Sequence, residues 1–137
     1  MKRPQHERVL DLLLTGRRLT VRQLREETGI ECIVRCIHDL RQLGVPVASI
    51  WCDPATGSPL RDDRGRILWW DGHWHAARQP PGSVAAYQLY CQGCREIEPS
   101  RLGWKPQHTD EGLVYDLREF RDTYLCPGCF ADQLCSV

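Results

Sequence analysis

Two pairs of closely spaced cysteines constrain this chain more than any other feature of its sequence. The pairs are Cys91-Gln-Gly-Cys94 and Cys126-Pro-Gly-Cys129, with 31 residues between them. Four thiolates in this paired spacing have the number and the softness that tetrahedral Zn²⁺ prefers, because each pair can direct two sulfurs at one ion. Since four cysteinates fill the coordination shell, we expect one structural zinc ion with no open position for catalysis.

The remaining cysteines show no comparable spacing. The chain has eight cysteines in 137 residues, but it has neither a secretion signal nor a run of ~20 apolar residues. We therefore expect a cytoplasmic protein that does not enter a membrane, in which metal binding is a more common role for cysteines than disulfides. Apart from Cys135 as an alternative ligand, the other four are expected to be small buried side chains: Cys32, Cys36, Cys52 and Cys135.

The composition changes near Gln79-Pro-Pro-Gly-Ser83, a stretch typical of a linker. Residues 1–80 carry 13 basic and 10 acidic side chains, whereas residues 81–137 carry 5 basic and 8 acidic ones. We therefore predict a first domain over 1–78, a linker over 79–83 and a zinc-binding module over 84–137. Because the module is acidic, protein is a better partner for it than phosphate.

The first domain is predicted to contain three helices followed by a β-hairpin. Thr20 and Gln23 have the spacing of a capping box, which starts the second helix. The predicted helices lie near 4–15, 20–28 and 30–43, and each is followed by a glycine that can end it: Gly16, Gly29 and Gly44. The β-prone runs 47–52 and 67–70 predict a hairpin with a long polar tip, with a third short strand considered over 73–77.

Tryptophans cluster in and after this hairpin. We expect them to pack in the core, where tryptophan contributes much burial in a small domain, and stacking on single-stranded bases is the alternative. They are Trp51, Trp69, Trp70 and Trp74. In the second module we expect a small hairpin over the metal, formed by Trp104, Leu113-Val-Tyr115 and Tyr124-Leu125. The last two ligands are expected to sit at the start of a short C-terminal helix.

Two stretches of the first domain, Leu14-Thr-Gly-Arg-Arg-Leu-Thr20 and Ile37-His-Asp-Leu-Arg-Gln-Leu-Gly-Val-Pro-Val47, resemble the small winged helix-turn-helix proteins of phages and prophages. The resemblance covers roughly residues 5–75. It implies an α+β fold of three helices plus a β-hairpin wing, and a DNA-binding regulator. Cys36 stands where that family commonly has an arginine, and Arg35 lies one residue earlier, about 100° around the helix. The second module resembles zinc-ribbon and treble-clef modules.

In a winged helix-turn-helix, the third helix enters the major groove while the second helix and the wing contact phosphates. Arg35 suits a bidentate guanine contact; Glu31 can accept from cytosine or stabilise the helix N-terminus by its charge. The predicted DNA-facing residues of the third helix are Glu31, Cys32, Arg35 and His38. The predicted phosphate contacts are Arg17, Arg18, Thr20, Arg22, Arg61, Arg64 and Arg66. Asp62 and Asp63 lie among the wing arginines, where they would pair with them or repel phosphate.

These features predict a sequence-specific, duplex-DNA-binding transcriptional regulator of phage or mobile-element type, whose zinc module serves stability or assembly, for example as a homodimer on a palindromic site. The alternative is a phage-encoded interaction module or inhibitor that binds a host protein. Arginines paired to internal carboxylates would favour the alternative. We do not expect an enzyme, because the chain has no asparagine, no His-Glu-x-x-His motif and no phosphate-binding glycine loop.

Overall fold

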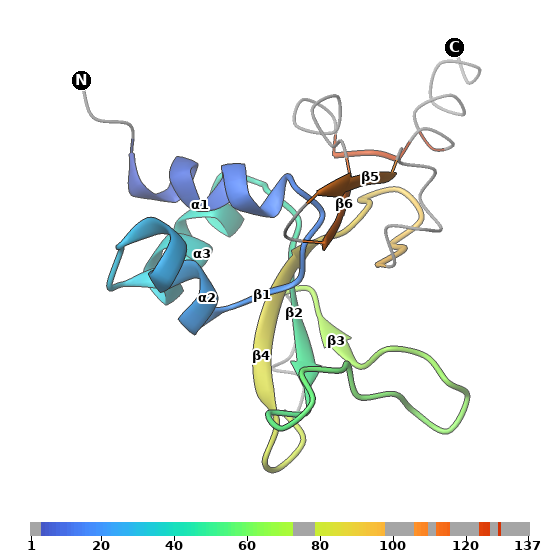
Figure 1. Ribbon diagram of the computed structural model, residues 1–137. Coiled ribbons are helices and arrows are strands. Elements are labelled where there is room, and N and C mark those ends of the chain that lie inside the picture. Colours follow the sequence, from blue (N-terminus) through green and yellow to red (C-terminus); the bar gives the residue numbers. More distant parts are fainter. Residues whose placement is uncertain are drawn as a thin grey trace.

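The computed structural model describes residues 4–72, 79–97, 106–109, 112–115, 124–126 and 129. Within these ranges, three helices and a four-stranded antiparallel sheet form a mixed α and β fold, followed by a two-stranded sheet (Figure 1). The helices are α1 (Gln5–Leu13), α2 (Val21–Thr28) and α3 (Ile33–Gln42). The strands are β1 (Leu19–Thr20), β2 (Val47–Cys52), β3 (Trp69–Trp70), β4 (Val84–Leu89), β5 (Pro106–Thr109) and β6 (Gly112–Tyr115).

The ends of α2 are set by residues that the sequence marks. The hydroxyl of Thr20 accepts from the backbone N–H of Gln23 at 3.2 Å, and the Gln23 side chain accepts from the Thr20 N–H at 2.9 Å, so the predicted capping box is confirmed. Gly29 ends the helix in the left-handed conformation, with φ of 73°. Helix α3 begins at Ile33, later than predicted, and its N-cap Cys32 makes no side-chain capping bond.

The main partner of β2 is β4 and not the run at 67–70. Strands β2 and β4 pair antiparallel along the whole of β2, whereas β2 and β3 share only two residue pairs. Strand β1 pairs with the other edge of β4, which gives the order β1-β4-β2-β3. Segment 79–83 therefore leads into a central strand of the first sheet. The local pattern did not reveal this pairing, because it joins segments far apart in the chain.

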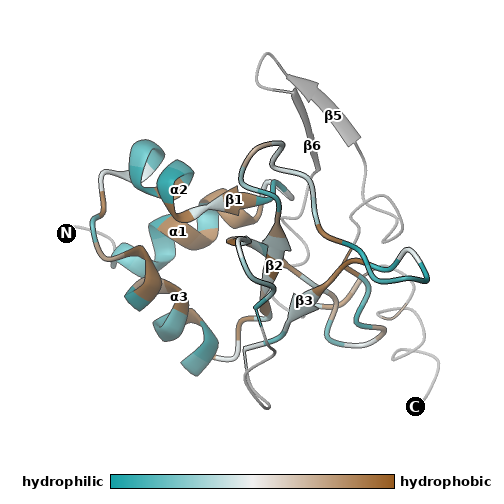
Figure 2. Ribbon diagram, turned by 90° about the horizontal axis from the view of Figure 1, so that it is seen from below, coloured by the Kyte–Doolittle hydropathy of each residue, from teal (hydrophilic) through white to brown (hydrophobic). Residues whose placement is uncertain are grey.

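The two faces of this sheet are covered by different parts of the chain. On one face, residues of β2 and β4 pack with the buried side chains of the three helices: Val47, Tyr87 and Leu89. The opposite face packs against Tyr90, Ile97, Ile67 and Trp69, and the Gln88 side chain there donates to the Ile97 carbonyl. Strand β2 is thus buried along its whole length. The helices carry hydrophobic and hydrophilic residues, as expected of helices with one buried side (Figure 2).

Several predictions for single side chains can be compared with the structure. Trp51 is buried, which confirms a core position, and Trp69 and Trp70 are half-buried. Cys36 and Cys52 are buried as predicted. The prediction of burial was wrong for Cys32, which is exposed because it precedes the first turn of α3. Some of the predicted features lie outside the described ranges. They are Trp74, Cys135, the candidate strand 73–77 and, apart from Cys129, the predicted C-terminal helix.

Candidate metal centre and nucleic-acid interface

The structure brings the four paired cysteines together. The Sγ atoms of Cys91, Cys94, Cys126 and Cys129 all lie within 4.8 Å of one another. Four sulfurs bound to a tetrahedral ion at ~2.3 Å are about 3.8 Å apart. The Sγ atoms of Cys94 and Cys126 are 3.9 Å apart. The cluster therefore has the spacing and the donor atoms to hold one metal ion.

The turn that carries the first pair is built closely around its sulfurs. The N–H of Arg95 donates to the Cys91 carbonyl at 2.9 Å, and Arg95 itself adopts a left-handed conformation with φ of 61°. Gly93 lies against the second pair: a Cβ atom at this position would be 2.8 Å from the Sγ of Cys129. The glycine between the first two cysteines is therefore required by the approach of the two pairs.

The thiols of the cluster differ in acidity. Burial alone would raise the pKa of Cys91, but N–H groups of Cys126, Cys94 and Gly93 donate to its sulfur and lower that pKa to about 7. Burial and then the neighbouring sulfurs raise the pKa of Cys129 to about 12, and burial also raises the pKa of Cys94. One thiolate is thus favoured by the protein alone, whereas further thiolates in so small a volume call for a cation.

The cluster is attached directly to the four-stranded sheet and to the turn after α3. Cys91 follows β4 by two residues, and the N–H of the intervening Tyr90 donates to the Pro46 carbonyl at 3.1 Å. The side-chain amide of Gln92 donates to the Gly44 carbonyl at 3.1 Å. The first cysteine pair is therefore held against the helical part of the molecule by bonds that cross the expected domain boundary.

Helix α3 presents a polar outer side. Arg35 and His38 are exposed, as are Glu31 and Cys32 just before the helix. In the part of the chain that the structure describes, the Arg35 side chain has no ion pair or hydrogen bond. The opposite side of the helix is buried: Ile33, Cys36, Ile37 and Leu40. The four residues predicted to face DNA therefore share an accessible surface.

The predicted phosphate contacts near α2 have mixed surroundings. Arg18 is exposed. Arg17 pairs with Glu27 at 2.9 Å, and Arg22 pairs with Glu26, one turn later in α2, at 3.2 Å. The Thr20 hydroxyl is used in the capping box. Of these four side chains, Arg18 and Arg22 have the accessibility that a phosphate contact needs.

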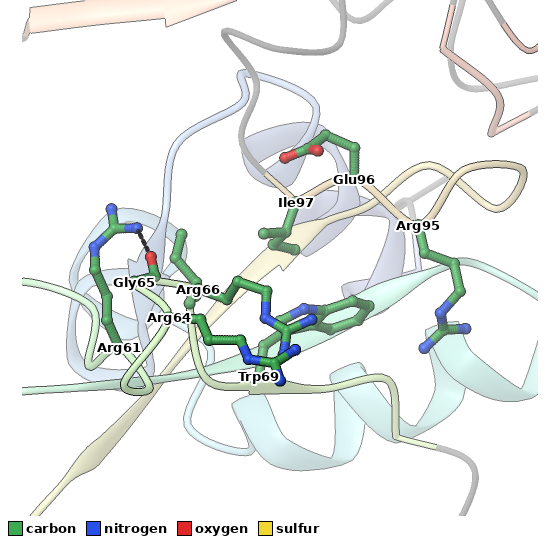
Figure 3. A pocket seen from close by; sticks show the side chains of 9 residues that line it. Arg61, Arg64, Gly65, Arg66, Trp69, Arg95, Glu96 and Ile97 are labelled. Carbon is green, nitrogen blue, oxygen red and sulfur yellow. Dashed lines mark hydrogen bonds between the residues drawn. The ribbon is translucent and has the colours of Figure 1, made fainter.

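Two of the three arginines of the predicted wing are bonded within their own loop, whereas the Arg64 side chain is exposed. Arg66 pairs with Asp62 at 3.3 Å, and the Nη1 of Arg61 donates to the Gly65 carbonyl at 2.8 Å. Together with Arg64 they line a pocket shared with Arg95, a residue that the sequence analysis did not single out (Figure 3). No local signal marks Arg95, because its position depends on the long-range pairing of β4.

No match to this chain was found among protein-family models, curated proteins or solved structures. In the described part of the chain, none of the helices has the length and apolar character needed to cross a membrane. The fold and the site thus define a mixed α and β protein with a four-cysteine candidate metal centre.

Proposed function

We propose that the helices and the four-stranded sheet form a winged helix-turn-helix domain that binds duplex DNA and reads its sequence. The order of elements supports this: a helix, a short strand, two helices joined by a tight glycine turn, and two long antiparallel strands. The connection between β2 and β4, residues 53–83, has the place of the wing. The biological role that fits is transcriptional regulation in a phage or mobile element.

The observation that carries the proposal is the accessible Arg35, which has no partner among the described residues and lies on a helix whose other side is buried. A guanidinium in this position can form two hydrogen bonds with the major-groove edge of guanine. The neighbouring Val34 is 62% exposed and offers an apolar contact to a thymine methyl group. Glu31, Cys32 and His38 extend the same surface.

Arginines at the start of α2 would fix the orientation of the duplex through phosphate contacts. Arg18 is accessible, and the Arg22–Glu26 pair is exposed on both sides, with 88% and 64% of the two side chains accessible. Such an exposed pair contributes little to stability, so its arginine can turn to a phosphate at small cost. This geometry therefore supports phosphate contacts next to the base-reading surface.

We propose zinc as the metal of the four-cysteine cluster. Four thiolates fill a tetrahedral shell and give the ion and its ligands a net charge of about −2, so the ion would be structural. The C-terminal part that it stabilises is acidic overall, so it is less suited than the first part of the chain to contact a duplex. Its role in this account is assembly, either as a homodimer that reads a palindromic site or with a host protein.

A second function is favoured by the apolar part of α3. Leu43, at the C-terminal end of the helix, is 66% exposed in addition to Val34. Nine residues place the two on different sides of the helix, so each is a separate apolar contact that a protein partner, such as a host protein inhibited by this chain, would cover. The two functions differ in their response to salt, because phosphate contacts release counterions when they form.

The test is the affinity of the zinc-loaded protein for a labelled duplex, measured by fluorescence anisotropy at several salt concentrations. Each phosphate contact contributes about −0.9 to the slope of log affinity against log salt. We expect Arg18→Gln to reduce the magnitude of the slope by about one. Arg8→Gln, which removes a charge from α1, serves as the control. Absence of binding at low salt by folded, zinc-loaded protein would overturn the proposal.

A further inference from the structure

Four arginines surround one pocket on the sheet face that lies away from the helices. The pocket has a volume of about 280 Å³, and its lining includes Arg61, Arg64, Arg66, Arg95 and Trp69. In Figure 3, Arg64 and Arg66 extend toward Trp69 from one side, while Arg95 lies on the other side of the indole. The sequence places these residues in two segments, and the pairing of β4 with β2 brings them together.

The loop that carries three of these arginines is held in a defined conformation by Asp62. Its Oδ1 accepts the backbone N–H groups of Arg64 and Arg66, both at 2.9 Å, and its carbonyl accepts the Gly65 N–H at 2.9 Å. The N–H of Arg66 is the largest cause that lowers the pKa of Asp62. Asp62 therefore acts mainly as a local organiser that positions the arginines.

Four arginines around the pocket face three carboxylates, Asp62, Asp71 and the lining residue Glu96, so one positive charge is left over among these residues. Arg66 pairs with Asp62, and Arg95 pairs with Asp71 at 2.9 Å while lying over the Trp69 ring at 5.1 Å. The Arg64 side chain is exposed and has no partner among the residues that the structure describes. Because Arg64 lines the same pocket as Arg66 and Arg95, a bound anion would offset the repulsion between these like charges.

The position of the pocket separates it from the proposed DNA surface. Trp69 and Ile97, which line it, belong to the cluster that covers one face of the sheet, whereas α3 packs on the opposite face. A duplex against the outer side of α3 would therefore lie across the sheet from the pocket. The pocket is thus separate from the α2 and α3 residues to which the DNA contacts are assigned above.

We propose that this pocket binds the phosphate group of a small ligand, either free phosphate or a phosphate ester no larger than a mononucleotide. Planar guanidinium groups can each offer two parallel N–H donors to phosphate oxygens, which favours phosphate over a spherical anion. The indole of Trp69, over which Arg95 lies at 5.1 Å, adds an aromatic wall to the pocket. This binding site is independent of the DNA-binding function proposed above.

Isothermal titration calorimetry of the full, zinc-loaded chain tests this inference. The probes are inorganic phosphate, adenosine 5′-monophosphate and unphosphorylated adenosine. We expect both phosphates to bind and adenosine to fail. Tighter binding of the monophosphate would identify an ester as the ligand, whereas equal or tighter binding of inorganic phosphate would identify free phosphate.

A pair of variants locates the binding. Arg64→Gln removes a guanidinium that is exposed and has no partner in the described part of the chain, and should weaken phosphate binding by about ten-fold or more. Arg8→Gln makes the same change of charge on α1 and should bind as the wild type does. Failure of both phosphates to bind at millimolar concentration, or equal binding by Arg64→Gln and wild type, would overturn the site. The duplex titration described above is scored separately, so either proposal can fail alone.

Discussion

The backbone N–H of Cys126 donates to the Sγ of Cys91 at 3.2 Å and so joins two cysteine pairs that are far apart in the sequence. This bond stabilises a thiolate at Cys91, which is buried where β4 ends. Because Gln92 is bonded to the turn after α3, the geometry of the metal centre is linked to the end of the proposed recognition helix.

The cluster should bind one zinc ion per chain, and Cys126→Ser should lose it. The serine removes one of four ligands and replaces a soft thiolate with an oxygen, so three thiolates remain in an incomplete shell. Zinc content by elemental analysis checks the result. Cys32→Ser, which changes an exposed cysteine outside the cluster, should keep the metal. A Cys126→Ser protein with full zinc content would refute the four-cysteine site.

Gly93→Ala should weaken zinc binding although no ligand is changed. The added methyl group would lie 2.8 Å from the Sγ and 2.9 Å from the Cβ of Cys129, so that side chain must move out of position. Competition with a chromogenic chelator measures the loss of affinity. Gln92→Ala, in the same turn, loses only its bond to Gly44 and should retain most of the affinity. Equal affinities for the two variants would contradict the packing argument.

Arg41 should matter for stability even though it lies on the proposed recognition helix. Its Nε and Nη2 donate to the Val47 carbonyl at 3.0 and 2.9 Å, and Nη2 also donates to Ser49. The guanidinium lies 5.3 Å from the Trp70 ring centroid. Arg41→Ala should lower the free energy of unfolding by about 2–3 kcal/mol, because the buried Val47 carbonyl and Ser49 hydroxyl lose this hydrogen-bond donor.

Urea denaturation measures this loss, and two variants serve as references. Arg41→Lys keeps the charge without the forked geometry and should fall between wild type and alanine. Arg35→Ala removes an exposed arginine that contacts no partner within the described ranges, and should change the free energy of unfolding by less than about 0.5 kcal/mol. If Arg35→Ala and Arg41→Ala lowered the free energy of unfolding by similar amounts, the structural role of Arg41 would be refuted.

Stability should fall at alkaline pH. Burial raises the pKa of the Cys36 and Cys52 thiols above 9.0 and the pKa of the Tyr87 and Tyr90 hydroxyls above 10.0. Between the unfolded and the folded pKa, the unfolded chain binds fewer protons, so the free energy of unfolding decreases as pH rises. The decline should begin near pH 9 with the thiols and steepen near pH 10 with the tyrosines.

Urea titrations of the zinc-loaded protein from pH 8 to pH 11 check this dependence. Cys36→Ala should make the first part of the decline shallower, because one of the two contributing thiols is gone. The metal ligands do not disturb the comparison above pH 9, since cysteines released on unfolding are then largely thiolates as well. A free energy of unfolding that stays constant or increases across this range would contradict the assignment.

Local signals in the sequence predicted the helices well. The capping box at Thr20, the glycine at position 29 and the spacing of Ile33, Ile37 and Leu40 depend on neighbours within one or two turns, and the structure has them all. The four-cysteine cluster was also predictable, because metal chemistry restricts the spacing of its ligands.

Structural features that depend on long-range strand pairing could not be predicted from local sequence patterns. Val84–Leu89 could be a helix or a strand by its composition, and only its pairing with β1 and β2 makes it the centre of the sheet. The convergence of Arg95 with the wing arginines follows from that pairing. The need for glycine at position 93 arises from contact with Cys129, which is remote in the chain. No pattern within one segment carries this information.

The most direct test of the central claim, that α3 reads duplex DNA, is selection from a random duplex library at near-physiological salt, using wild type and Arg35→Ala in parallel. We expect wild type to enrich one motif, and a dimer to enrich two half-sites about 10 base pairs apart. Arg35→Ala should relax one position of that motif at a cost of ~1–3 kcal/mol. No enrichment by folded, zinc-loaded wild type would contradict sequence-specific binding through α3.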